Sequence, residues 1–129
     1  MISNFKNLLI TEDQSIRTAL EKINRSGLKN IIVVNSKNKF KGIITDGDVR
    51  RAILRKINLN DKVKKIYNRN PIFTYDNEHN NEKVKKIFLS KKIDLIPVIN
   101  KKKKEVVDII KAIDIFYKKN LSITKKTPI

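Results

Sequence analysis

The sequence G-I-I-T-D-G-D-V-R-R-A-I-L at residues 42–54 decides the fold of this chain. Its two isoleucines, residues 43–44, predict the end of a short buried strand. Val49, Ala52 and Ile53 then recur at helical spacing, so a helix is expected to begin within this stretch. The chain therefore turns from a strand into a helix over only a few residues.

Thr45 and Asp48 occupy this strand-to-helix turn. A spacing of three residues allows a capping box, in which each side chain hydrogen-bonds the backbone N–H of the other residue. One interpretation is a well-capped helix and nothing more. The other is a nucleotide clamp, because free N–H groups at a helix N-terminus attract phosphate and a carboxylate beside them can accept hydrogen bonds from a ribose diol. Recurrence of the pattern elsewhere in the chain would favour the second interpretation.

The composition excludes several classes of protein. The 129 residues contain no cysteine, so disulfides and thiolate-bound metals are ruled out. His79 is the only histidine and is expected in an exposed loop, which leaves little material for a catalytic triad or a histidine metal site. No apolar run approaches the roughly 20 residues of a membrane span. We expect a cytoplasmic chain that has neither catalytic residues nor a metal and does not bind a membrane.

The net charge of +17 has two interpretations. It can mark a nucleic-acid-binding surface, with Tyr67, Phe73, Tyr75 and Tyr117 as possible stacking platforms. It can also reflect compositional bias, because lysine far outnumbers arginine and is spread over almost every segment. Proteins that read bases and phosphates favour arginine. Nucleic acid is therefore not expected as a partner, and a Lys-rich nucleic-acid-binding domain remains an alternative.

Hydrophobic periodicity predicts the same order of elements twice. A helix ending at Gly27 follows the first strand, and a second helix is expected after residue 45. In the first half we expect strands at 8–11, 30–35 and 40–45, with helices at 16–26 and 46–56. In the second half we expect strands at 72–74, 95–99 and 106–110, with helices at 81–91 and 111–119.

The two halves form an internal repeat with a period near 65. Val33 corresponds to Val98 and Asp48 to Asp114, because the second Lys-rich turn is one residue longer. A half of this size cannot cover both faces of its own small sheet, whereas two halves packed sheet against sheet can. The predicted fold class is α/β (α+β), with two β-α-β-β-α repeats packed about a pseudo-two-fold axis. The expected divisions are a first repeat at 1–60, a second at 61–120 and a linker at 121–129.

The second copy of the turn reads D-I-I-K-A-I-D at residues 108–114. Asp114 keeps the carboxylate, but Lys111 replaces the threonine and Asp108 replaces the glycine. Packing about a pseudo-two-fold axis would create two equivalent clefts, of which the first has both polar groups. In the second cleft, Lys111 could hold a phosphate as a point charge, or it could pair with Asp108 and fill the space.

The chain resembles a tandem pair of CBS domains over residues 8–120. The resemblance rests on G-h-h-T-x-x-D (h, apolar) at residues 42–48, on the buried segments 31–35 and 96–99, and on Asn70-Pro71. It implies an adenosine nucleotide (AMP, ADP or ATP) as regulatory ligand and a homodimer. It also implies that Asp48 binds ribose and that Thr45 lies near phosphate. The remaining implied or candidate ligand-binding residues are Ile10, Thr11, Asn30, Ile31, Arg51, Leu95, Ile96, Lys111 and Asp114.

The runs T-D-G-D-V-R-R-A-I at 45–53 and N-R-N-P at 68–71 resemble CBS pairs attached to sugar-phosphate enzymes. The chain is similar to the N-terminal regulatory module of sugar-1-phosphate nucleotidylyltransferases. The CBS module of an arabinose-5-phosphate isomerase-like enzyme is the alternative. The resemblance implies a covalently attached catalytic domain beyond the linker at 121–129, whereas the segment itself is not an enzyme.

Overall fold

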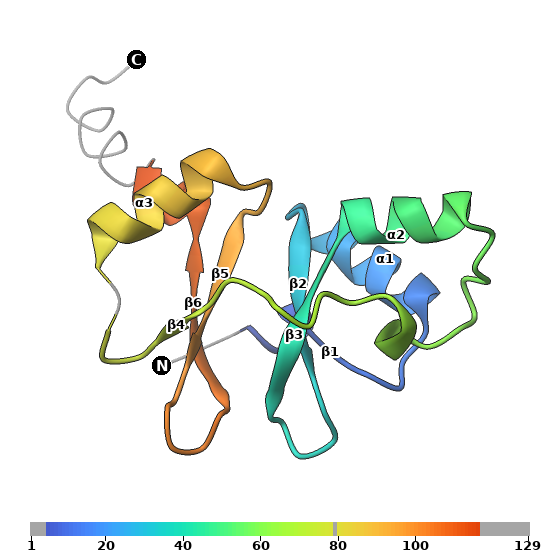
Figure 1. The fold of residues 1–129 in the computed structure, drawn as a ribbon, viewed down its shortest axis with the longest axis horizontal. Helices are drawn as coiled ribbons and strands as arrows, with labels where there is room; N and C mark the ends of the chain where they lie inside the picture. The colour runs from blue at the N-terminus through green and yellow to red at the C-terminus, as the bar shows by residue number, and fades with distance from the viewer. Residues whose placement is uncertain (1–4, 79, 117–129) are drawn as a thin grey trace.

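A computed structural model describes residues 5–78 and 80–116. His79, the predicted end of the last helix at 117–119 and the predicted linker at 121–129 lie outside the described residues, as does Tyr117. The described chain folds into two three-stranded sheets, each flanked by helices (Figure 1).

The two sheets have the same topology. In the first, β1 (Leu9–Thr11) pairs in parallel with β2 (Asn30–Val34), and β2 pairs antiparallel with β3 (Phe40–Thr45). The second repeats this order with three further strands, which are β4 (Thr74–Tyr75), β5 (Leu95–Ile99) and β6 (Val106–Lys111). The predicted strands at 40–45 and 95–99 are confirmed. The predicted strand at 72–74 was wrong in position, because the chain reaches pairing distance of β5 only at residue 74.

The helices begin and end where the sequence provides caps. Ser15 accepts a hydrogen bond from the N–H of Thr18 at the start of α1 (Ile16–Ser26), and Gly27 ends this helix with a φ of 74°. Asn80 caps α3 (Asn81–Ser90) in the same way. The other helical segments are α2 (Asp46–Leu54), the short 3₁₀ turns η1 (Lys6–Leu8) and η2 (Val63–Lys65), and residues 112–116.

The internal repeat is visible in the strand register. Asn30 pairs with Thr45 in the first sheet as Leu95 pairs with Lys111 in the second. Each sheet also has one irregularity at the same place, after Val33 in β2 and after Val98 in β5. The predicted fold of two related β-α-β-β-α repeats is therefore confirmed over the described residues, which include residues 112–116 of the last helix.

Equivalent residues of the two repeats meet each other across the interface. The N–H of Lys29 donates to Asp94 Oδ2 at 3.2 Å, and Lys39 forms a bridge with Glu105 at the opposite end of the strands. A residue contacts its own equivalent only near a two-fold axis, so the pseudo-axis runs between β2 and β5. Consistent with this, the two sheets stand side by side with both hairpin turns at the same end (Figure 1).

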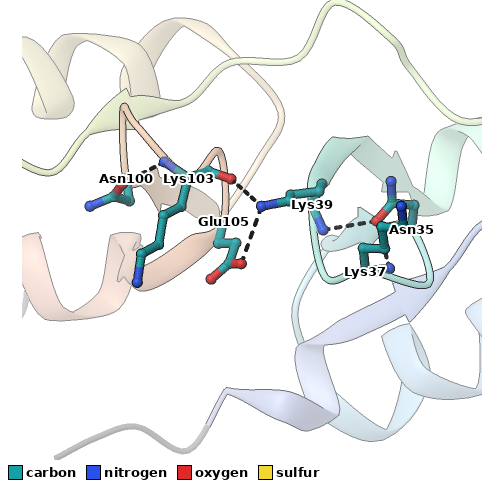
Figure 2. Close-up of polar contacts among 6 residues, drawn as sticks. All are labelled: Asn35, Lys37, Lys39, Asn100, Lys103 and Glu105. Atoms are coloured by element: carbon teal, nitrogen blue, oxygen red, sulfur yellow. Dashed lines mark hydrogen bonds and ion pairs between the residues drawn. The ribbon is translucent and has the colours of Figure 1, made fainter.

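The hairpin turns are held together by Lys39. Its Nζ donates to the carbonyl oxygen of Lys103 at 2.8 Å and lies 3.3 Å from Glu105 Oε2 (Figure 2). Within the turns, the side chains of Asn35 and Asn100 accept backbone N–H groups, as asparagine does in Asx turns. Two lysine-rich turns that are 65 residues apart in the sequence thus form one end of the molecule.

Asn30 is the one polar residue in the buried core of the described chain, and it joins the two repeats. Its Nδ2 donates to the carbonyl of Leu95 at 3.0 Å, and its Oδ1 accepts from the N–H of Asp94 at 3.1 Å. Around it, Ile31 packs in a single core with Leu95 and Ile99 of the other repeat. The repeats therefore share a core, as the sheet-against-sheet prediction requires.

The segment between the repeats runs along the free edge of β3, and Gly42 makes this approach possible. Asn68 exchanges two backbone hydrogen bonds with Ile43, at 2.9 and 3.3 Å. A Cβ atom at position 42 would collide with the carbonyl oxygen of Asn68 and would lie 2.7 Å from the ring of Tyr67. Glycine at the first position of the motif is thus explained by a backbone contact.

Tyr67, in the same segment, is buried with its hydroxyl in a polar network. The hydroxyl donates to Glu12 at 2.7 Å and accepts from Arg69 at 2.8 Å. Burial, followed by the hydrogen bond to Glu12, raises the pKa of Tyr67 to about 12. In the unfolded chain the pKa is about 10.

We predict that Tyr67 makes stability depend on alkaline pH. Because the folded chain keeps the phenolic proton longer, this stabilisation is complete below about pH 10 and is lost as the pH rises toward 12. Tyr67→Phe should lower the free energy of unfolding by about 1 kcal/mol at neutral pH. The gap to the parent should close between pH 10 and 12 in urea titrations. A gap independent of pH would contradict this account.

Candidate functional site: a polar cleft between the repeats

The N-terminus of α2 forms the capping box predicted from the sequence. The N–H of Asp48 donates to Thr45 Oγ1 at 3.0 Å, and the N–H of Thr45 donates to Asp48 Oδ2 at 2.9 Å. The second carboxylate oxygen, Oδ1, accepts from Arg51 Nη2 at 2.8 Å. The capping interpretation is therefore confirmed. It does not exclude ligand binding, because Arg51 is largely exposed and its ion pair with Asp48 is screened by water.

A cleft of about 480 Å³ opens beside this helix end. One wall comes from the first repeat and includes Thr45, Gly47 and Asp48. The other wall comes from the segment before β4 and the segment before β5 of the second repeat. Its members are Asn68, Asn70, Ile72, Lys91, Lys92 and Ile93.

Two kinds of surface meet in this cleft. Ile43, Ile72 and Ile93 supply apolar side chains from both walls, which suits a planar base. Four basic side chains and two acidic ones also line it. These are Arg50, Arg51, Lys91 and Lys92 with Asp46 and Asp48. The net excess of positive charge favours an anion.

Backbone donors complete the anion-binding character of the cleft. The N–H of Asp46 is already bonded to the carbonyl of Lys29 at 2.9 Å, and that of Asp48 to Thr45. The N–H of Gly47 lies between them and has no intrahelical acceptor at this position of a helix. It lies where the positive end of the helix dipole meets the cleft.

The structure brings together only three of the predicted ligand residues, which are Thr45, Asp48 and Arg51. Four others are fully buried and do not line this cleft; three of them lie at the interface of the repeats, whereas Ile96 packs against Val84 and Phe88 within the second repeat. The four are Asn30, Ile31, Leu95 and Ile96. Both polar atoms of the Asn30 amide are also hydrogen-bonded, to Asp94 and Leu95.

Ile10 and Thr11 do not line the cleft beside Asp48. They line a separate apolar groove near the hairpin end of the molecule. The resemblance had placed them together with Asp48, but β1 and the N-terminus of α2 lie at opposite ends of the first sheet: Thr11 pairs with Val34, whereas Thr45 pairs with Asn30.

The second copy of the turn keeps the backbone arrangement of the first but carries different side chains. Lys111 ends β6 opposite Leu95, and the N–H of Ala112 donates to Asp94 at 2.8 Å, just as Asp46 donates to Lys29. Asp114 lies on the helical segment at 112–116 and is exposed. No ion pair joins Lys111 to Asp108 in the described part of the chain.

Sequence reasoning missed the second wall of the cleft; the signal that could have found it is the internal repeat, not a local motif. A cleft between two repeats takes its walls from both of them. The wall opposite Thr45 and Asp48 therefore had to come from the second repeat, before its first and middle strands. Asn70, Ile72 and Ile93 occupy these places.

Other kinds of site find no support in the described residues. Across residues 5–78 and 80–116, no group of three histidine, aspartate or glutamate side chains gathers as metal ligands would. No described helix combines the length and the hydrophobicity needed to cross a bilayer.

Comparison with known proteins identifies this arrangement. Residues 2–55 match the CBS domain family. The CBS-pair protein CBSX2 from Arabidopsis thaliana superposes with a TM-score of 0.72 at 18% identity, over 93% of this chain and 90% of that one. The chain folds as a CBS domain pair.

Other CBS-pair structures show the same likeness at low identity. A CBS domain pair/ACT domain protein from Thermotoga maritima gives a TM-score of 0.68 at 16% identity, over 93% of this chain and 90% of that one. The cytosolic domain of the Mg²⁺ channel MgtE, solved in complex with ATP, gives 0.63 at 18% identity, over 89% and 44%. At such identities the likeness concerns the CBS-pair fold alone.

Two curated relatives match the first repeat of the CBS pair. Both are uncharacterized proteins from Helicobacter pylori, 39% and 38% identical over 56 residues. The matched segment is 43% of this chain and 17% of each relative. The similarity therefore spans about a sixth of the relatives' length.

Proposed function

We propose that the CBS pair is a regulatory module that binds an adenosine nucleotide in the cleft beside Thr45 and Asp48. The observation that carries this proposal is the meeting of a helix N-terminus, a carboxylate, an apolar pair of walls and excess positive charge in one cleft. Phosphate suits the helix end and the basic side chains, and the ribose diol suits Asp48. The complex of MgtE with ATP supports the choice of ligand class.

We expect Arg51 to change partner when the nucleotide binds. In the free cleft Arg51 occupies Asp48 Oδ1, whereas Asp48 Oδ2 belongs to the capping box. A ribose hydroxyl group would take over Oδ1 and leave the cap in place. The released guanidinium is then free to contact the phosphate, and Lys91 and Lys92 approach it from the other wall.

We further propose that the pair is the N-terminal sensing segment of a cytoplasmic sugar-phosphate nucleotidylyltransferase and associates as a homodimer. The motif at residues 45–53 and the much greater length of the curated relatives support an attached domain. Exposed apolar side chains on the helices, Leu54 at 77% and Leu89 at 76%, support association. The proposed division into residues 1–60, 61–120 and a linker at 121–129 follows the repeat.

A thermal-shift panel of AMP, ADP, ATP, CMP and S-adenosylmethionine tests the nucleotide proposal. A ligand that binds only the folded chain stabilises it by about 2.7 kcal/mol at a hundredfold excess over its dissociation constant. For a chain of this size we expect a rise in melting temperature of roughly 5–10 °C. Asp48→Ala should remove the shift. No shift with any nucleotide, or the same shift in the variant, would contradict the proposal.

A further inference from the structure

A second concave site lies apart from the cleft beside Asp48. It is bordered by β1 of the first repeat. It is an open groove of about 710 Å³. Its lining is mainly apolar and joins β1 to the hairpin end of β6. The residues are Phe5, Lys6, Leu9, Ile10, Thr11, Gln14, Val34, Asn38, Val106 and Val107.

At the equivalent place in the other half, three aromatic rings pack against one another, and two of them, Phe73 and Tyr75, also border a smaller pocket of about 470 Å³. The rings of Phe40 and Phe73 lie 5.4 Å apart, and those of Phe73 and Tyr75 lie 5.2 Å apart. Both contacts have tilted or edge-on geometry, which is favourable for aromatic pairs. Lys104 Nζ lies 5.5 Å from the centre of the Tyr75 ring, within the range of a cation–π interaction.

The strand register relates this cluster to the groove. Thr11 pairs with Val34 as Tyr75 pairs with Ile99, so Thr11 is the equivalent of Tyr75. Phe40 pairs with Val34 as Val106 pairs with Ile99, so Val106 is the equivalent of Phe40.

Two more positions complete the correspondence. Leu9 and Phe73 each lie two residues before the equivalent pair Thr11 and Tyr75, so they are equivalent as well. Asn38 and Lys104 are the residues with positive φ in the two turns, at 67° and 60°. Each member of the cluster therefore has a smaller counterpart in the groove, at Leu9, Thr11, Asn38 and Val106.

We propose that this groove binds a small planar aromatic molecule that carries a negative charge. The fold accommodates stacked rings at the equivalent place, and the smaller side chains leave that space open to a ligand. Of the described lining residues, Lys6 is charged and none is acidic, so the charge of the groove complements an anion. The volume lies in the range of small-molecule sites.

The fluorescent probe 1-anilinonaphthalene-8-sulfonate, an aromatic anion, tests the proposal on the 129-residue chain. We expect saturable binding of one probe molecule per chain. Val106→Phe and Thr11→Tyr place in the groove the residues of the other half, and each should weaken binding by about tenfold or more. Lys6→Gln should weaken binding of this probe several-fold but not that of the uncharged N-phenyl-1-naphthylamine.

Ile53→Ala, which removes an exposed apolar side chain on α2, is the matched control and should leave binding unchanged. Circular dichroism establishes that each variant is folded. If Val106→Phe does not fold, Thr11→Tyr decides alone, because Thr11 is only partly buried and tolerates a larger side chain. Equal affinity in the parent and the folded groove variants, or loss of binding in Ile53→Ala, would overturn the proposal.

Discussion

Replacing Gly42 with alanine is expected to lower the free energy of unfolding by about 3 kcal/mol. The added methyl group would overlap the carbonyl oxygen of Asn68 and the ring of Tyr67. Neither can yield easily, because the first is backbone and the second is buried. Relief of the overlap would break the two backbone hydrogen bonds between Ile43 and Asn68. Chemical denaturation followed by circular dichroism measures the loss.

Gly47→Ala is the matched control for this change. A Cβ atom at position 47 would lie 3.2 Å from Arg51 Nη1, which is the end of a flexible and exposed side chain. Alanine is also the better helix former by about 1 kcal/mol. We therefore expect Gly47→Ala to be neutral or stabilising. Similar losses for the two variants would mean that the close approach of the linker to β3 is not what requires glycine at position 42.

Asn30→Ala is expected to cost about 3 kcal/mol of stability. The substitution leaves the N–H of Asp94 and the carbonyl of Leu95 without partners in a buried interface, and it opens a small cavity. Both repeats lose a shared contact, so the whole CBS pair should unfold in one transition at lower denaturant concentration.

Asn35→Ala is the matched control for Asn30→Ala, because Asn35 forms its hydrogen bonds within a hairpin turn and not between the repeats. Asn35 also accepts two backbone hydrogen bonds, at 2.9 Å each, but it lies in a partly exposed hairpin turn. Its loss should cost only about 1 kcal/mol. If Asn30→Ala instead left stability unchanged and weakened nucleotide binding, Asn30 would be a ligand residue as the family resemblance implied, and its structural assignment would be wrong.

The sequence was sufficient for the fold because its signals are local and occur twice. The apolar segments 31–34 and 95–99, the left-handed Gly27 and the capping pair Thr45 and Asp48 each specify their own element. The recurrence at an offset of 65 residues then supplied the pairing of the two halves. Short strands with few apolar residues were predicted less well, which is why the strand at 72–74 was displaced.

The candidate site was only half predictable, since half of it depends on how the repeats are placed. Thr45, Asp48 and Arg51 lie on one turn and are read directly from the sequence. The opposite wall with Asn70 and Ile93 is near them only because the pseudo-axis runs between β2 and β5. No local sequence pattern predicts how close the two walls of the cleft lie to each other.

Isothermal titration calorimetry with ATP tests the central claim, which is that the cleft beside Asp48 binds nucleotide. We predict one ATP per parent chain. Asp48→Asn, which can still accept the capping hydrogen bond, should lose most of this binding. Asp114→Asn, the same change at the equivalent position of the second repeat, should retain it. Equal binding by the parent and both variants, or no binding by a folded parent chain, would contradict the account.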